Sequence, residues 1–395
     1  MRSRCGRVLV PWSLGRAPGL PGVEGGPPRP VPLARRARGE RVGVPSLPPD
    51  VHLQRLGVQG LTRRWDRTPD DVVRRILAVQ AQDLRGARLA VRSRSTGLLA
   101  RDVDAAFDAR RLVVAWLNRG TLHLVAAEDY WWLHPLTTPQ LAAGSRRRLE
   151  QEGVSPAQLE TGIEVVSRAV TAAPVSRDDL RALLDDAGVP TKRQAFVHVL
   201  FAASLRGLLL RGPVLPDGEQ AFVDPVTWLG PRPPDADPDE ALGRLAQRYL
   251  VAHGPARDAD LATWAGTTLG AARRGLAVLG STADDDGLHR LPGAPATAGA
   301  VPAPVLLGPF DPVLHGWVDR EAVIGRHVGL VTSNGIFKAS SLVGGRAVGT
   351  WTLPGGRVTL QALEPLAADV AAALAADARD VHRYLGLPER DMLTD

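Results

Sequence analysis

The triplet Gln80-Ala81-Gln82 combines residue types and a spacing that could serve a chemical step. Glutamine has no group that titrates near pH 7, so neither side chain is a general base in the ordinary sense. Each amide oxygen can still orient a water molecule and stabilise positive charge that grows on a substrate. The pair therefore suits a reaction that depends on positioning and fixed dipoles more than on proton transfer.

The two amides can serve one site only if the backbone between them is extended. Residues two apart point to different faces of a helix but to the same face of a strand. We therefore expect the helix that begins near Pro69 to end or distort at Val79 and Gln80. Gln80 also lies on the apolar stripe of that helix, so a buried structural glutamine is the alternative. Asp83, the neighbouring carboxylate, is interpreted first as a helix cap or salt-bridge partner and second as a base.

The segments around the triplet predict helices followed by a hairpin. The helix starts after Thr68 with a cap and with Pro in its first turn, and further helices fit residues 86–95 and 101–110. Leu112–Leu117 and Thr121–Val125 read as strands joined by Asn118-Arg119-Gly120. Helices and then a hairpin are the order of a winged helix-turn-helix unit.

An internal repeat extends this pattern. Residues 173–180 align with 254–261, and each copy follows a long amphipathic helix, at 156–171 and at 239–253. Each is followed by a second helical segment (192–206 and 269–279) and by a hairpin-like stretch around Asp-Gly (208–224 and 281–291). Two ordinary helical hairpins that are similar by accident are the alternative.

The predicted fold class is α+β, mainly helical, with three tandem winged-helix units, a small β-rich element and a C-terminal helix. The expected divisions are a disordered Pro/Gly/Arg-rich tail at 1–50, units at 51–150, 151–230 and 239–292, the β-rich element at 305–362, and the last helix and tail at 363–395. A wrongly chosen start codon and a basic arm that touches DNA are alternatives for the tail.

Composition excludes several classes of protein. The net charge of +6 resides in residues 1–50, where nine Arg face three acidic residues, so any DNA-binding surface must come from uneven charge on the body. No apolar run approaches the roughly 18 residues of a membrane helix. One cysteine, Cys5, excludes a disulfide framework and a Cys-based zinc site and favours the cytoplasm. Phosphate-loop, zinc-protease, hydrolase and dinucleotide motifs are absent, so no metal or cofactor is implied.

Three stretches together resemble one known family. They are residues 76–83, residues 116–125, and Pro309-Phe310-Asp311-Pro312 with Gly316-Trp317 and Asp319-Arg320. They resemble the winged-helix family of bacterial alkylpurine and interstrand-crosslink DNA glycosylases (the AlkZ and YcaQ type), in order over about 51–385. The resemblance implies a C-shaped body that embraces duplex DNA and cuts the N-glycosidic bond of an N7-alkylated purine. It also implies that Gln80 and Gln82 are catalytic.

Basic and polar residues of each predicted unit are candidate DNA contacts. Those on or beside the presumed recognition helices and the first hairpin are Arg119, Thr121, His123, Lys192, Arg193, Arg206, Arg273 and Arg274. Solvated charges at turns and on helix faces, and a structural role for His123, are the alternatives. Asp284-Asp285-Asp286 indicates that the third hairpin points away from DNA.

The leading hypothesis is a monomeric, monofunctional DNA glycosylase that acts on double-stranded DNA in the cytoplasm and associates with the nucleoid when bound. A non-catalytic winged-helix transcriptional regulator is the alternative, because a fold does not dictate a function. A protein-interaction scaffold is a third hypothesis.

Overall fold

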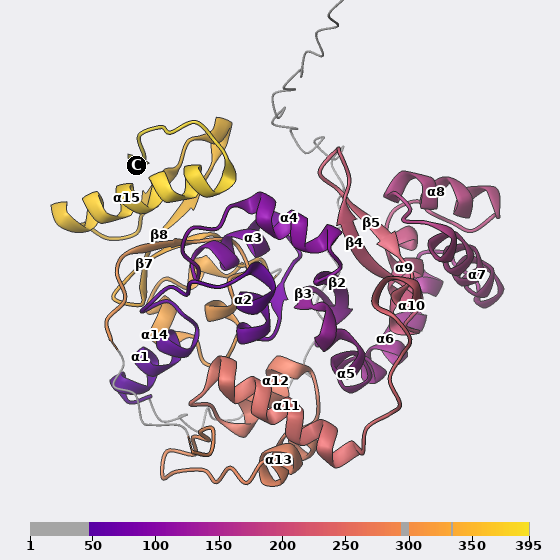
Figure 1. The fold of residues 1–395 in the computed structure, drawn as a ribbon, viewed down its shortest axis with the longest axis horizontal. Coiled ribbons are helices and arrows are strands. Elements are labelled where there is room, and N and C mark those ends of the chain that lie inside the picture. The colour runs from indigo at the N-terminus through magenta and orange to yellow at the C-terminus, as the bar shows by residue number, and fades with distance from the viewer. Residues whose placement is uncertain (1–46, 294–299, 333–334, 395) are drawn as a thin grey trace, which may run out of the picture.

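One order of elements recurs along the chain: a helix, a short extended segment, two helices and a hairpin. The computed structural model describes residues 47–293, 300–332 and 335–394, so the tail expected to be disordered lies almost entirely outside them. After α1 (Pro49–Val58), the first copy comprises α2 (Pro69–Ile76), β1 (Val79–Gln80), α3 (Leu84–Arg92), α4 (Ala100–Asp108), β2 (Leu112–Leu117) and β3 (Thr121–Ala126). Figure 1 shows this copy in the middle of the molecule.

Two further copies follow a helical connection. The connection is α5 (Ala127–Thr137) and α6 (Pro139–Gln151). The second copy is α7 (Pro156–Ala172), α8 (Arg177–Asp186), α9 (Ala195–Leu205), β4 (Leu210–Val214) and β5 (Gln220–Val223), with α10 (Pro225–Leu229) after it. The third is α11 (Pro238–His253), α12 (Asp258–Ala265) and α13 (Leu269–Val278). Helices α7, α9, α11 and α13 agree with the predicted ones to within a few residues, whereas α5, α6 and α10 were not predicted.

The three copies share a backbone contact. In each, a residue between the first two helices pairs with the returning arm of the hairpin: Val79 with Leu124, Val175 with Phe222, and Ala256 with His289. The recurrence at 173–180 and 254–261 therefore corresponds to a real structural repeat.

The third hairpin differs from its prediction. Residues 281–291 contain no regular strand, and the bridge at His289 is their one described β pairing. The carboxylate of Asp284 accepts the backbone N–H groups of Asp286 and Leu288, which ties these residues into a compact turn. This segment is therefore a turn-like loop in place of two paired strands.

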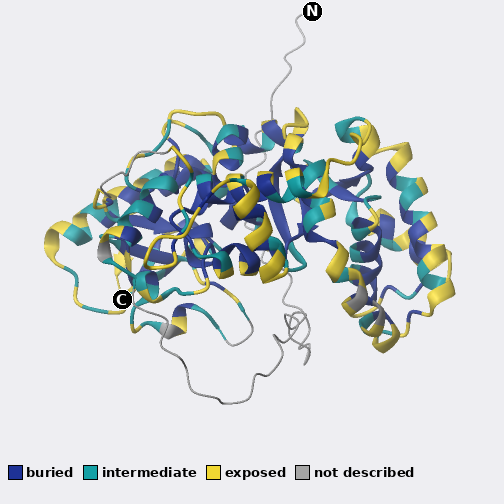
Figure 2. Cartoon of the chain, turned by 90° about the horizontal axis from the view of Figure 1, so that it is seen from below, coloured by how far each residue is buried: buried dark blue, intermediate teal, exposed yellow. Residues whose placement is uncertain are grey.

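One five-stranded sheet joins the first two copies, in the order β1-β3-β2-β4-β5. It packs between two cores, one formed with helices of the first two copies and one formed with the third copy and the C-terminal part. Figure 2 shows buried residues continuing through the body, with exposed residues on the outer turns of the helices. The sheet thus places the Gln80 segment between the copies.

Residues 305–362, where a β-rich element was predicted, contain four strands and an irregular segment. The sheet has the order β10-β9-β8-β7-β6, from β6 (Val305–Leu307), β7 (Ser340–Val343), β8 (Arg346–Thr352), β9 (Thr359–Ala362) and β10 (Leu393–Thr394). Between β6 and β7 the chain forms two 3-10 turns (Pro312–Leu314 and Val328–Leu330) and α14 (Glu321–Ile324). A third 3-10 turn (Pro354–Gly356) joins β8 to β9. Helix α15 (Ala368–Leu385) covers the sheet. Gly344 and Gly345, both with positive φ, form the turn that joins β7 to β8.

Two buried ion pairs fix this element to the first copy. Arg94, just after α3, forms a bidentate pair with Asp311 at 2.8 Å, and both side chains are fully buried. Arg92 pairs with Asp377 of α15 at 2.8 Å. The fold is therefore a mixed α+β body with two small sheets, and none of its described helices is both long and apolar enough to cross a membrane.

Candidate active site

Helix α2 ends before both glutamines, as expected: Gln80 lies in the short strand β1, and Gln82 lies in a bend two residues further on. Helix α2 is capped by Thr68 and ends at Ile76, and Leu77 takes a positive φ of 69° that reverses the chain into β1. Leu77 and Ala78 pack in the core shared with the third copy, whereas Ile76 packs in the other. The chain therefore crosses from one core to the other and back between Ile76 and Val79. Helix α2 ends at Ile76, three residues before Val79, where its end was expected.

Alternation along β1 sets the direction of the glutamine side chains. Val79 and Ala81 both pack in the core of the first two copies, and Ala81 N–H donates to the Leu122 carbonyl at 2.7 Å. Gln80 and Gln82 therefore face away from that core. Gln80 is 5% exposed, while Gln82 is exposed.

Helix α3 begins directly after the triplet and is held from two sides. The Asp83 carboxylate accepts the Gly86 N–H at 3.0 Å, which confirms the expected cap. A Cβ on Gly86 would lie 2.5 Å from the Pro309 carbonyl oxygen, so only glycine permits the present approach of the β-rich element. The segment at Pro309, which is part of the motif that resembles the known family, therefore packs directly against α3, the helix that follows the glutamines.

The tip of the first hairpin is docked on the third copy. Arg119 donates to the carbonyls of Thr263 and Trp264 at 3.0 and 2.8 Å. Burial, followed by the charge of Arg320, lowers the pKa of Arg119 to about 10. The side chain is therefore neither the solvated turn charge nor the free phosphate contact considered from the sequence. The Thr121 hydroxyl is sealed from solvent, so this conformation offers it no DNA contact.

His123 is the cross-strand neighbour of Gln80. Its Cα pairs with that of Gln80 in the β1–β3 register, and its side chain is 2% exposed. Its Nδ1 lies 2.9 Å from the Thr121 carbonyl oxygen, which can only accept, so Nδ1 carries the proton. Burial and the charge of Arg119 lower the pKa of His123 to about 3. The imidazole is therefore neutral at pH 7.

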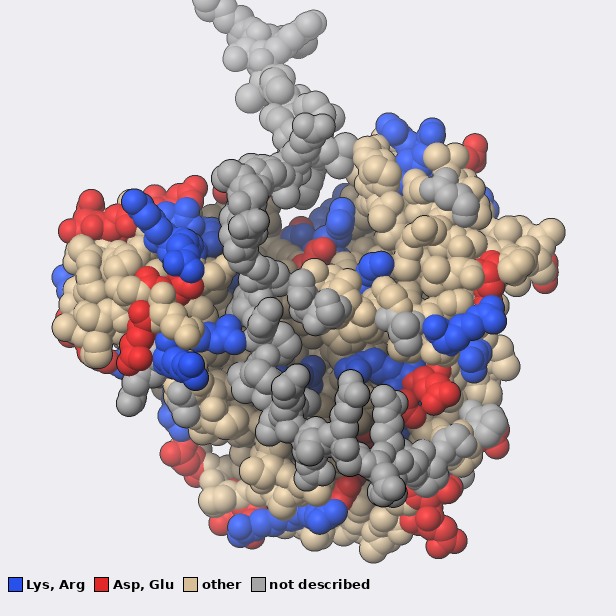
Figure 3. Space-filling model, turned by 180° about the vertical axis from the view of Figure 1, so that it is seen from behind, with Lys and Arg blue, Asp and Glu red and all other residues tan. Residues whose placement is uncertain are grey.

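The five remaining predicted DNA contacts are exposed, and four of them have carboxylate partners. Arg193 pairs with Glu152, Arg206 with Glu160, Arg273 with Asp258 and Arg274 with Asp239, whereas Lys192 has no ion pair within the described part of the chain. They are separate from the Gln80 segment in the fold. Figure 3 shows basic side chains both on the rim and inside a hollowed middle region of one face.

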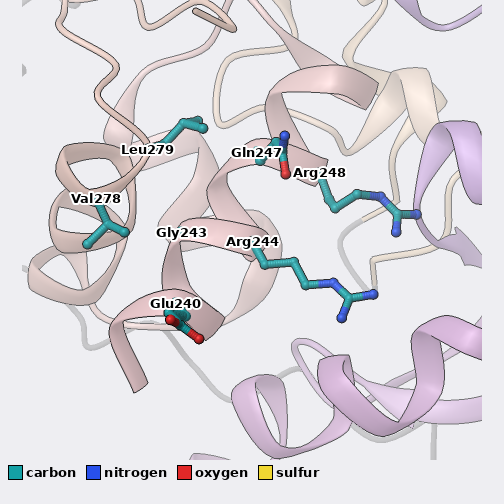
Figure 4. A pocket seen from close by; sticks show the side chains of 7 residues that line it. All are labelled: Glu240, Gly243, Arg244, Gln247, Arg248, Val278 and Leu279. Atoms are coloured by element: carbon teal, nitrogen blue, oxygen red, sulfur yellow. The ribbon is translucent and has the colours of Figure 1, made fainter. Parts of the chain in front are cut away.

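One surface hollow of the described chain lies elsewhere and contains none of the predicted site residues. Its volume is about 550 Å³, and residues of α11 and α13 with Leu279 line it: Glu240, Gly243, Arg244, Gln247, Arg248, Val278 and Leu279. Figure 4 shows Arg244 and Arg248 pointing the same way out of it. Arg248 is held by Asp129 and the Arg74 carbonyl, and Arg244 lies 4.5 Å from the Trp132 ring centre. Both cations thus serve contacts between elements.

Sequence reasoning missed His315, which lies between the two stretches 309–312 and 316–317 that carry the resemblance. His315 Nε2 donates to the Phe310 carbonyl at 2.7 Å, and its ring lies 4.9 Å from that of Phe337. Burial, and then Arg119 and His123, lower its pKa well below the ordinary value. The signal in the sequence that could have identified His315 was its position directly before Gly316-Trp317, within the motif that resembles the known family. Within the described ranges, no group of three His, Cys, Asp or Glu residues could hold a metal ion.

Known proteins are similar to this chain in both fold and sequence. A family model described as AlkZ-like DNA glycosylase matches residues 73–384. Because this match spans most of the sequence, the chain belongs to the AlkZ-like DNA glycosylase family. The family assignment supports a DNA glycosylase, a hydrolase of N-glycosyl bonds, over a transcriptional regulator.

Two comparisons with proteins of Streptomyces sahachiroi agree with this family assignment. An interstrand DNA cross-link repair glycosylase is 29% identical over 225 residues, which are 54% of this chain and 59% of that protein. The chain therefore matches little more than half the length of that relative. The solved structure of the DNA glycosylase AlkZ is similar with a TM-score of 0.72 and 26% identity, over 88% of this chain and 99% of that one.

Proposed function

We propose that this chain is a monofunctional DNA glycosylase that hydrolyses the N-glycosidic bond of N7-alkylated purines in double-stranded DNA. The observation that carries the proposal is the short strand β1, whose neighbours Val79 and Ala81 pack in the adjoining core, so that Gln80 points away from that core while Gln82 follows it as an exposed residue. An N7-alkylated purine is cationic and leaves readily, so neutral amides that orient water and stabilise the sugar cation suffice. The catalytic pair is Gln80 and Gln82.

Interstrand crosslinks through alkylated purines are a second substrate class. The support is the Streptomyces sahachiroi relative, which is an interstrand DNA cross-link repair glycosylase. Each linked purine carries the same kind of leaving group as a singly alkylated one, so the same residues serve both substrates.

The three structural copies are winged-helix units, with boundaries near 51–150, 151–230 and 239–292. The support is the shared order of elements and the shared pairing of Val79, Val175 and Ala256 with the return arm. Lys192, Arg193, Arg206, Arg273 and Arg274 contact phosphates, because DNA readily displaces weak ion pairs between exposed side chains. The protein acts as a monomer in the cytoplasm, on the nucleoid.

Base release from methylated duplex DNA tests the activity. Wild-type protein should convert N7-methylguanine sites to abasic sites, and Gln82→Ala should abolish that conversion. Gln151→Ala, at an exposed glutamine at the end of α6, is the matched control and should keep full activity. A wild-type protein that releases no base disproves the proposal. Tight binding to one undamaged sequence, with about 1–3 kcal/mol lost per mismatch, would favour the regulator.

A further inference from the structure

Five histidines of the described chain are buried: His123, His198, His253, His315 and His382. Both ring nitrogens of His253 and of His382 are sealed from solvent and have no hydrogen-bond partner. No ring nitrogen of His123 or His315 belongs to that sealed set. His123 and His315 instead each use one ring nitrogen in a hydrogen bond to a backbone carbonyl, that of Thr121 and that of Phe310 respectively.

His123 presents an accepting nitrogen beside Gln80. Because Nδ1 donates to the Thr121 carbonyl, Nε2 is left with a lone pair. Directly opposed residues of an antiparallel pair have side chains on the same face, about 4.5–5.5 Å apart at Cβ. The imidazole of His123 therefore lies on the same side of the sheet as the amide of Gln80.

The surroundings of His123 keep the ring neutral. The charged group that faces it from the hairpin turn is Arg119, fixed by the carbonyls of Thr263 and Trp264. From the β-rich element it is faced by His315, whose Nε2–H is used by the Phe310 carbonyl and whose Nδ1 is then also an acceptor. Burial and the charge of Arg119 lower the pKa of His123, and burial, Arg119 and His123 lower the pKa of His315.

We propose that His123 is a further catalytic residue, whose Nε2 accepts a hydrogen bond from the attacking water and takes that water's proton. This rests on the glycosylase function proposed above. The C1′–N9 bond breaks, and its electron pair neutralises the cationic ring of the departing purine. The water oxygen forms the new bond to C1′, its proton passes to Nε2, and solvent then removes it.

A neutral acceptor fits this reaction better than a charged residue with a proton to donate. The positive charge moves from the purine to the sugar, and an imidazolium at this place would oppose it. A water bonded to a sugar cation is a strong acid, so even a weakly basic imidazole removes its proton. His123 thus complements glutamines that accept hydrogen bonds but cannot accept the proton.

Two substitutions distinguish the proposed role of Nε2, which accepts from the water, from the structural role of Nδ1, which donates to the Thr121 carbonyl. In His123→Asn the amide reaches the position of Nδ1 only, whereas in His123→Gln it reaches that of Nε2. We expect the single-turnover release of N7-methylguanine to fall on the order of 10²-fold in His123→Asn. His123→Gln should recover only the part of that loss that comes from the hydrogen bond to the water, because its amide oxygen accepts a hydrogen bond but not the proton. Binding to duplex DNA with a stable abasic analogue should not change in either variant.

A matched control is His134→Asn, because the half-buried His134 also bonds a backbone carbonyl, that of Ser204. It should leave base release unchanged. His123→Asn within threefold of wild type, or equal losses in both variants with weakened DNA binding, would overturn the proposal. An inactive wild type overturns the glycosylase function and this role together.

A second measurement needs only the wild-type protein. The ¹⁵N chemical shifts of the His123 ring should show a neutral ring protonated on Nδ1 at pH 7. An imidazolium, or a proton on Nε2, would overturn the proposed role.

Discussion

Gln80 of β1 and His123 of β3 lie directly opposite each other in an antiparallel pair, and the register continues to Ala115 of β2. The three side chains share one face of the sheet, the face turned toward the third copy and the β-rich element. Arg211 of β4 pairs with Val114 and therefore lies on the other face. The candidate chemistry is thus assembled on one face only.

Gln80→Ala and Gln82→Ala should differ in stability although both lose activity. Gln80 is buried, so its truncation should lower the free energy of unfolding by about 1–3 kcal/mol. Gln82 is exposed, and its truncation should change that free energy by less than about 0.5 kcal/mol. Urea unfolding of both variants, next to base release, measures the two effects. Equal destabilisation would contradict the different burial of the two side chains.

The sequence predicted most helices and the first hairpin, because caps, apolar periodicity and turn residues are local signals. The helix break before Gln80 followed from chemistry: two amides on one site require extended backbone. The structure places that break at Leu77.

Contacts between distant segments could not be predicted in this way. The residues around Arg119 in the sequence do not indicate that its guanidinium donates hydrogen bonds to the carbonyls of residues 263 and 264. They also do not indicate that His315 lies near His123. The ion pairs of the exposed arginines likewise depend on how helices pack. The third hairpin was overpredicted because Asp-Gly favours tight turns whether or not paired strands flank them.

Gly86→Ala should disturb the site through α3. The new methyl would lie 2.5 Å from the Pro309 oxygen, so the helix or the β-rich element must shift. We expect a loss of about 1–3 kcal/mol in unfolding free energy and slower base release. Gly144→Ala in α6 meets nothing within 4 Å and should instead stabilise by about 0.4–1 kcal/mol. Equal stabilities of the two variants would show that the approach at Pro309 is not tight.

Asp311→Asn should be strongly destabilising. It leaves the fully buried Arg94 charge without its partner, which typically costs about 3–5 kcal/mol. Asp239→Asn removes the exposed partner of Arg274 and should cost at most about 1 kcal/mol. Chemical unfolding of the two variants gives the comparison, and a small effect at Asp311 would contradict a buried charge pair.

His253 should make stability depend on pH below 6.5. Burial lowers its folded-state pKa to about 3, so between pH 6.5 and 3 the unfolded chain binds a proton that the folded protein does not. Stability from this group is complete above pH 6.5 and is lost as the pH falls toward 3, by at most about 1.4 kcal/mol per pH unit. His253→Phe keeps the stacking on Tyr249 and removes this dependence. The variant should therefore gain stability relative to wild type as the pH falls, and parallel pH profiles would contradict the prediction.

Lys192→Ala should weaken DNA binding through one phosphate contact. Lys192 is exposed just before α9 and has no ion pair among the described residues, so its charge is available to DNA. Loss of one contact lowers the slope of log affinity against log salt by about 0.9. Lys338→Ala, at the other lysine of the chain and exposed in the β-rich element, is the control and should leave the slope unchanged. The same change in both variants would mean that overall charge, and not a contact at α9, sets the affinity.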